Sequence, residues 1–234
     1  MFLLFQRTLS LTVTAREWLV KGFIPRNEAC NPFGRPDAFK GVVAAQLCAH
    51  VACGADFLGM PVRQGPTGYF AAERGAQAAR RVKGNLQRLG ASDDVPSFFG
   101  SRPMSLLNDA DVATMLAEIR SVERDAGAPL AFLVIDTQSR TMDGDENSSK
   151  DGAAYAKAIE RIREATNAVI WIIAHTGHDG EKQGRPRGSS TLMGAYDVFY
   201  QFKKTGEHAG GITVTIDRDG LAGKTIGFDL EYPY

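Results

Sequence analysis

The 234-residue sequence has no excess of charge of either sign, since Lys plus Arg and Asp plus Glu both total 27. Without bulk charge the chain is not attracted as a whole to nucleic acid or membrane surfaces, so any such contact must come from a local cluster. Long apolar runs are also missing. The longest, at 131–135 and 169–174, are far shorter than the roughly 20 residues of a membrane span. The sequence therefore predicts no membrane partner.

Cysteine is scarce as well. Cys30, Cys48 and Cys53 are odd in number and lack the paired spacing of a metal site, so reduced and mostly buried thiols are expected. Gln6 and Arg7 follow the apolar residues 1–5 too soon for the core of a secretory signal. These observations favour a cytoplasmic protein.

What the sequence does contain is an alternation of short apolar runs and longer stretches with helical periodicity. This alternation is typical of βαβ units around a buried, mostly parallel sheet. The predicted strands are 67–72, 131–135 and 169–174, and the predicted helices are 42–53, 75–89, 109–126 and 151–166. The fold class is therefore α/β.

The C-terminal part has a different pattern, with apolar runs at 198–202, 211–216 and 224–230 between glycine-rich turns. It predicts an antiparallel extension of the sheet. No interdomain linker is evident, so we expect a single domain over residues 1–234. A central strand is expected before Gly34, but Pro32 cannot donate to a sheet ladder, which predicts that this strand ends early or is distorted.

An imperfect copy of the phosphate-binding pattern GxxxxGK[ST] lies at 34–41. In an intact loop, backbone N–H groups cradle the phosphates, the lysine reaches the β and γ oxygens, and a hydroxyl holds Mg²⁺. Here Phe39 replaces a glycine, Gly41 replaces the hydroxyl residue, and Asp37 adds a negative charge. The candidate nucleotide-binding residues are Gly34, Arg35, Pro36, Asp37, Ala38, Phe39, Lys40 and Gly41. The alternative is a simple turn containing proline.

Three ionisable residues directly follow predicted strands: Glu73, Asp136 and His175. Ligands of open parallel sheets bind at the carboxyl edge, where these residues would lie. Each also has an ordinary explanation, because the two acids could cap helices and the histidine could bond a loop carbonyl. Together they match the needs of ATP hydrolysis: an acid for Mg²⁺, a carboxylate that orients water, and a polar group near the γ-phosphate.

Further motifs extend this pattern over nearly the whole chain. They are WLVKGFIP at 18–25, AAERG at 71–75, LVIDTQSR at 133–140, DENSS at 145–149, IAHTG at 173–177, RGSSTLMGAYD at 187–197 and RDG at 218–220. In these motifs the chain resembles the RecA-fold P-loop ATPases of the RepA plasmid helicase type, which are hexameric replicative helicases often described as AAA-family ATPases. Relative to that family the Walker A loop at 34–41 is degenerate.

The resemblance implies ATP and Mg²⁺ as cofactors and a role for each candidate. Lys40 would contact the β and γ phosphates, Asp136 would be the acid associated with Mg²⁺, and Glu73 would orient the attacking water. His175 would couple the γ-phosphate to the following loop, and Arg218 would be an arginine finger on a neighbouring subunit's ATP. Relatives commonly have a lysine two residues before that arginine, where this chain has Ile216.

The resemblance also implies a homo-oligomeric ring, a hexamer, around single-stranded DNA. The loop at 176–190 would contact the DNA backbone, although an ordinary solvated loop is an equal alternative. Its candidate DNA-binding residues are His178, Lys182, Arg185 and Arg187. A second basic group is interpreted as the solvated face of a helix and not as a binding site. It consists of Arg80, Arg81, Lys83 and Arg88.

Two functions are consistent with these observations. The first is an ATP-dependent helicase or translocase that acts on single-stranded DNA in replication or recombination. The second is a catalytically weakened RecA-fold protein that binds nucleotide or DNA in a regulatory or structural role, which Phe39, Gly41 and Ile216 favour. A scaffold with an empty ATP site is a third and remote alternative.

Overall fold

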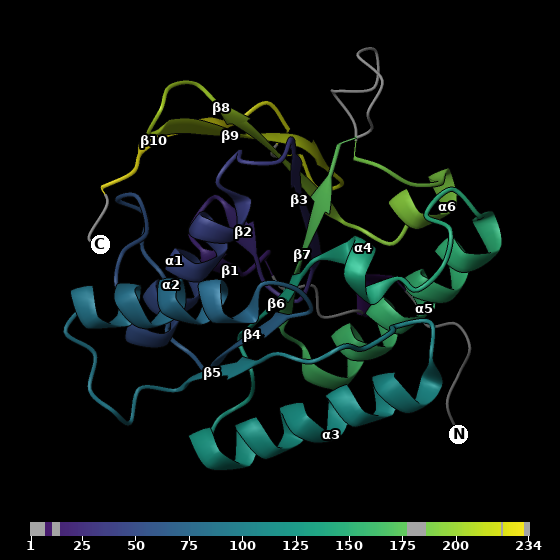
Figure 1. Ribbon diagram of the computed structural model, residues 1–234, viewed down its shortest axis with the longest axis horizontal. Helices are drawn as coiled ribbons and strands as arrows, with labels where there is room; N and C mark the ends of the chain where they lie inside the picture. Colours follow the sequence, from purple (N-terminus) through teal and green to yellow (C-terminus); the bar gives the residue numbers. More distant parts are fainter. Residues whose placement is uncertain (1–7, 11–14, 177–185, 221, 232–234) are drawn as a thin grey trace.

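The computed structural model describes residues 8–10, 15–176, 186–220 and 222–231. Its centre is an eight-stranded sheet in the order β10-β9-β8-β3-β7-β6-β4-β5 (Figure 1). The strands are β3 (Ala29–Gly34), β4 (Thr67–Ala71), β5 (Ser97–Gly100), β6 (Phe132–Asp136), β7 (Val169–His175), β8 (Val198–Lys204), β9 (Ala209–Asp217) and β10 (Thr225–Asp229). All pairs from β8 to β5 are parallel, whereas β9 is antiparallel to both β8 and β10. The α/β class and the antiparallel extension are thus confirmed.

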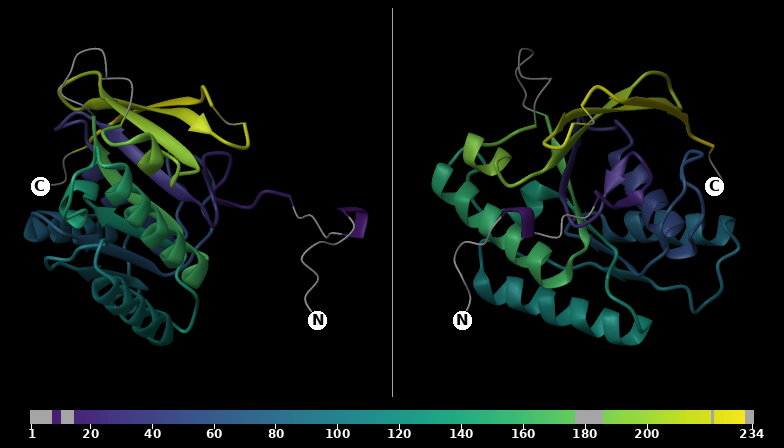
Figure 2. Two further views of the ribbon diagram at one scale, coloured as in Figure 1. Left: turned by 90° about the vertical axis from the view of Figure 1, so that its right-hand side faces the viewer. Right: turned by 180° about the vertical axis from the view of Figure 1, so that it is seen from behind.

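Helices cover both faces of the sheet (Figures 1 and 2). The longer ones are α1 (Lys40–Cys53), α2 (Gly75–Arg88), α3 (Asp109–Ala126) and α5 (Ser149–Thr166); short helical turns are η1 (Thr8–Ser10), α4 (Gln138–Thr141) and α6 (Ser190–Met193). One apolar core forms between the sheet and α1 with α2, and a second forms between the sheet and α3 with α5. The central strands β6 and β7 are buried on both faces along nearly their whole length, which explains their continuous apolar sequences.

Local capping explains why α3 begins where the sequence predicts. The Asn108 side chain accepts hydrogen bonds from the N–H groups of Ala110 and Asp111, which have no partner within the helix. The prediction missed β5, a four-residue edge strand, and the small antiparallel sheet of β1 (Trp18–Val20) and β2 (Ile24–Pro25). Such short strands carry too few residues for a periodic signal. Among the described residues, no helix is long and apolar enough to cross a membrane.

The strand does not end early at Pro32: β3 continues through it to Gly34 and is buried along its whole length, although its pairing with β7 is interrupted at Asn31 and Pro32. The flanking pairs, Cys30 with Trp171 and Phe33 with Ala174, would direct the Ile172 carbonyl to the nitrogen of Pro32, which has no N–H to donate. The side-chain amide of Asn31 takes over, because its Nδ2 donates to the Ile172 oxygen at 3.2 Å. One side-chain hydrogen bond therefore replaces the missing ladder bond and lets a central strand contain proline.

Candidate functional site

A cavity of about 1310 Å³ opens at the carboxyl edge of the parallel strands. Following the sheet order β3, β7, β6, β4, it meets the loop that leads to Lys40, then His175, Asp136 and Glu73. The structure therefore brings these four predicted residues together around one space, which is larger than most small-molecule pockets. Strand order makes neighbours of residues that are far apart in the sequence.

The loop at 34–41 leaves β3 and turns directly into α1, whose first residue is Lys40. Gly34 is needed because a Cβ there would lie 2.5 Å from the Phe202 carbonyl oxygen. Asp37 and Phe39 have φ values of 63° and 65°, in the left-handed region that favours glycine. The backbone thus takes a left-handed conformation at Phe39, where the intact phosphate-binding pattern has glycine.

Packing explains how Phe39 holds this conformation. Its ring meets Phe228 of β10 edge to face at 6.2 Å, and the Lys204 ammonium lies 5.3 Å from the ring centroid. A left-handed residue with a side chain costs about 1–2 kcal/mol, and contacts of these two kinds contribute about 0.5–1.5 kcal/mol each. The antiparallel extension therefore stabilises the loop in place of the glycine.

Lys40 is almost fully buried, with 5% of its surface exposed. Its Nζ donates to the carbonyl oxygens of Gly34 at 2.9 Å and Arg35 at 2.8 Å. Burial lowers its pKa to about 8, although the charges of Asp136 and Asp37 act in the opposite direction. An ammonium has three N–H donors, so one remains for a ligand.

This lowered pKa predicts a pH dependence of stability. Folding shifts the Lys40 pKa from 10.5 down to about 8, so the unfolded chain binds more protons between these values. The contribution of Lys40 to the free energy of unfolding should therefore rise by about 3 kcal/mol as pH increases from 8 to 10.5. Chemical denaturation at pH 7.5 and at pH 10 gives the free energy of unfolding of the protein and of Lys40→Met. The change with pH in the difference between these two free energies measures the contribution of Lys40. A difference that does not change with pH would contradict the expected burial.

Asp136 is the last residue of β6, and its Oδ2 accepts a hydrogen bond of 2.6 Å from the Tyr69 hydroxyl. Burial raises its pKa, while the Tyr69 hydrogen bond acts against that rise. Among the described residues no group of three metal-ligating side chains occurs. Mg²⁺ needs no such group, because it is usually held by one or two carboxylates together with phosphates and water. Asp136 at the wall of the cavity fits that mode.

Neither Glu73 nor Asp136 is a helix cap, because Arg74 and Thr137 occupy the cap positions of α2 and α4. Glu73 instead forms an ion pair of 2.7 Å with Arg140 at the cavity wall.

His175 presents a buried Nδ1 without a hydrogen-bond partner among the described residues. Burial, followed by the charge of Lys40, lowers its pKa. The ring is therefore favoured in its neutral form. Within the part of the chain that the structure describes, Nδ1 does not make the bond to a loop carbonyl that was the alternative explanation for this histidine.

Basic residues of α2 also line the cavity, namely Arg80, Arg81 and Arg88, whereas Lys83 does not. The interpretation of this group as a solvated helix face overlooked that placement. The available signal was the position of α2, which begins two residues after Glu73 and so starts at the same edge of the sheet. These arginines bring positive charge to a cavity that also contains Asp37, Glu73 and Asp136.

Arg218 lies away from this cavity. It directly follows β9, and the last residue of β9, Asp217, pairs with Val198, the first residue of β8. This point lies at the amino ends of the parallel strands, whereas Lys40 lies at their carboxyl ends. The side chain of Arg218 is exposed, and its Nη2 donates to the Gly194 carbonyl at 2.9 Å. Ile216, two residues earlier, is half exposed. Arg218 is not brought to the nucleotide loop of its own chain.

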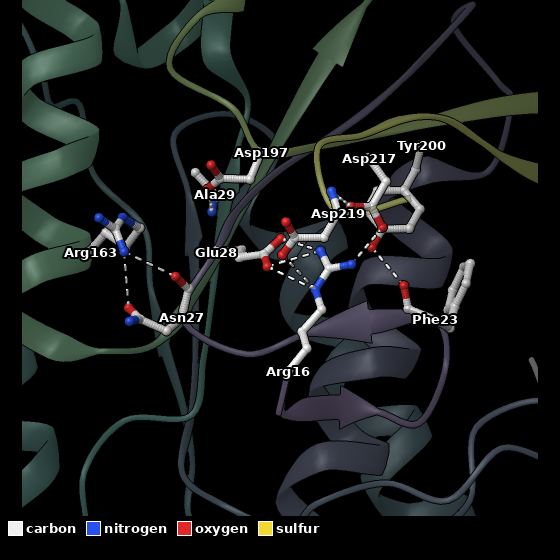
Figure 3. A network of polar contacts seen from close by, with 10 residues as sticks. All are labelled: Arg16, Phe23, Asn27, Glu28, Ala29, Arg163, Asp197, Tyr200, Asp217 and Asp219. Carbon is white, nitrogen blue, oxygen red and sulfur yellow. Dashed lines mark hydrogen bonds and ion pairs between the residues drawn. The ribbon is translucent and has the colours of Figure 1, made fainter. Parts of the chain in front are cut away.

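Arg16 contacts Asp217 and Asp219 (Figure 3) and so anchors the turn between them, which carries Arg218. It forms ion pairs of 2.8 Å with Glu28, which precedes β3, and of 2.8 Å with Asp217, and it lies 3.6 Å from Asp219. Both flanking neighbours of Arg218 are therefore tied to one guanidinium. The segment before β1, the start of β3 and the end of β9 meet at this point.

Three of the four predicted DNA-binding residues, His178, Lys182 and Arg185, lie outside the described residues. Arg187 is described: it is half exposed, and its Nε lies 3.4 Å from a carboxylate oxygen of Glu146.

A mostly parallel sheet with a lysine-bearing loop and an acidic strand end at its carboxyl edge defines the class of RecA-like P-loop ATPases. The model of the AAA_25 family, described as an AAA domain, matches residues 2–181, and the chain therefore belongs to this family. A solved structure whose title describes it as an ATPase domain superposes with a TM-score of 0.62 and 14% identity, covering 86% of this chain and 81% of that one. This likeness shows the RecA-like fold. No curated protein matches the chain.

Proposed function

We propose that the chain is an ATPase that binds ATP with Mg²⁺ in the cavity at the carboxyl edge and uses its hydrolysis to move along single-stranded DNA, as a helicase or translocase in replication or recombination. The convergence of Lys40, His175, Asp136 and Glu73 on one cavity carries this proposal. The likeness to an ATPase domain supports its first half, and the sequence motifs shared with RepA-type helicases support its second half.

Each residue has a role that follows from its position. Lys40 holds the β and γ phosphates, and the N–H groups of the loop at 34–41 surround them. Asp136 would hold Mg²⁺, which would neutralise phosphate charge, and Glu73 would orient the attacking water. His175, neutral and without a partner at Nδ1 among the described residues, is suited to sense the γ-phosphate. Arg81 adds charge beside Gly41, where its Nη1 would lie 3.3 Å from a Cβ.

A homo-oligomeric ring, a hexamer in the cytoplasm, completes the proposal. Arg218 lies too far along the sheet to serve its own cavity, so as an arginine finger it would act on the ATP of a neighbouring subunit. Single-stranded DNA would then contact the loop that contains His178, Lys182, Arg185 and Arg187. We take residues 1–234 as one such ATPase domain.

Glu73→Gln tests the hydrolysis step. The amide keeps the size of the side chain but cannot accept a proton, so the rate of ATP hydrolysis should fall by about 10²-fold while nucleotide binding is kept. Phosphate release is measured with and without single-stranded DNA, and Glu207→Gln, another carboxylate at the cavity, is the matched control. Equal rates for the protein and Glu73→Gln would refute the assigned role.

The same measurement separates the second candidate, a weakened RecA-fold protein that binds nucleotide or DNA in a regulatory role. Phe39 and Gly41 favour it, because the loop keeps its conformation while losing a glycine and a hydroxyl. Nucleotide binding without hydrolysis in either the protein or the variant would support this candidate over the motor.

A further inference from the structure

We propose that the Tyr69 hydroxyl replaces the missing hydroxyl of residue 41 and holds Asp136 in the orientation that a Mg²⁺-bound nucleotide requires. Tyr69 is thus a positioning residue that acts through Asp136. This inference rests on the proposed function, since it concerns the same nucleotide site.

The Tyr69 hydroxyl lies close to the place that a side-chain hydroxyl of residue 41 would occupy. A Cβ built at Gly41 would lie 3.5 Å from Asp136 Oδ2 and 3.7 Å from the Tyr69 hydroxyl oxygen. A serine or threonine at this position would therefore place its own hydroxyl close to both atoms. Gly41 offers no such group, and Tyr69 fills the need from the neighbouring strand with a bond of 2.6 Å to Oδ2.

The fold fixes Tyr69 in this position. It lies on β4 and pairs with Val134 of β6, which comes two residues before Asp136. Its long side chain spans this distance and reaches the Asp136 carboxylate at the carboxyl edge. Its ring stacks on Phe99 at 5.9 Å, and only 2% of the residue is exposed. Burial raises the pKa of the phenol well above its ordinary value, so the hydroxyl keeps its proton and donates a hydrogen bond to the carboxylate.

The partner of Tyr69 differs from those of the other buried tyrosines. The hydroxyls of Tyr155, Tyr196 and Tyr200 bond Thr141, Gln138 and a backbone carbonyl, respectively, all of them neutral. Tyr69 instead bonds a partly buried carboxylate at the wall of the cavity. A tyrosine that served only the core could use a neutral acceptor of this kind. The hydrogen bond to Asp136 links Tyr69 to the nucleotide site.

The test compares Tyr69→Phe with the double variant Tyr69→Phe/Gly41→Ser and with Tyr200→Phe, which loses a buried hydroxyl bond far from the cavity. The affinity for adenylyl imidodiphosphate, a slowly hydrolysed ATP analogue, is measured by calorimetry with excess Mg²⁺ and with a chelator. Tyr69→Phe should lose on the order of tenfold in affinity with Mg²⁺ and little without it. The serine of the double variant should restore most of the loss, and Tyr200→Phe should behave like the unmodified protein.

Two results would overturn the inference while leaving the proposed function intact: an unchanged Mg²⁺ effect in Tyr69→Phe, or an equal loss with and without Mg²⁺ that serine does not restore. Absence of analogue binding to the unmodified protein under both conditions would overturn the proposed function and this inference with it. Circular dichroism of each variant shows that the fold is kept.

Discussion

Replacing Lys40 by alanine is expected to weaken ATP binding by about 10²-fold. The ammonium is buried, two of its donors hold the Gly34 and Arg35 carbonyls, and the third is available to a phosphate oxygen. Alanine removes a charge-assisted bond of about 1.5–3 kcal/mol together with the positive charge opposite the phosphates. Each 1.4 kcal/mol corresponds to a factor of ten in the dissociation constant.

Calorimetry with ATP and Mg²⁺ measures this loss, and Lys83→Ala is its matched control, because Lys83 is exposed and does not line the cavity. The control should bind like the unmodified protein. If Lys40→Ala also binds unchanged, the nucleotide does not occupy this loop. If the unmodified protein binds no nucleotide, the fold serves as a scaffold.

Replacing Arg16 by methionine is expected to lower the free energy of unfolding by about 3–5 kcal/mol. The substitution removes the guanidinium that faces Glu28 and Asp217 (Figure 3). The two carboxylates are mostly or fully shielded from water. Removing one partner of a shielded ion pair costs this much because the remaining charges keep their desolvation penalty. Chemical denaturation measures the effect.

Arg161→Met is the matched control, since its pair with Asp109 is exposed and should contribute less than about 1 kcal/mol. Burial already raises the pKa of Glu28, although Arg16 acts against that rise. A raised carboxyl pKa destabilises the folded state when the group is ionised and ceases to do so once it is protonated. The deficit of Arg16→Met should therefore be smaller at pH 5 than at pH 7.5, and an equal deficit at both would contradict the assignment.

The sequence predicted much of the fold because the signals were local. Buried strands such as 131–135 are apolar throughout, α3 has a capping residue before it, and glycine-rich turns marked the antiparallel extension. Pro32 misled the prediction, since the repair by Asn31 depends on the Ile172 carbonyl of a strand about 140 residues away.

The residues of the candidate site likewise fall into those that the sequence could identify and those that it could not. Lys40, Glu73, Asp136 and His175 could be identified because each directly follows a recognisable strand or belongs to a recognisable loop. Arg81 could not, because a basic helix face has the same local sequence whether it meets water or a cavity.

By itself, the sequence determined the α/β class, the loop at 34–41 and the order of ionisable residues along the chain, since these depend on local periodicity and on side-chain chemistry. Only the tertiary structure decided that Phe39 holds a left-handed turn against Phe228, that Tyr69 bonds Asp136, and that Arg218 lies far from the cavity of its own chain. These relations depend on the order of the strands in the sheet, because that order sets which distant residues meet at one edge.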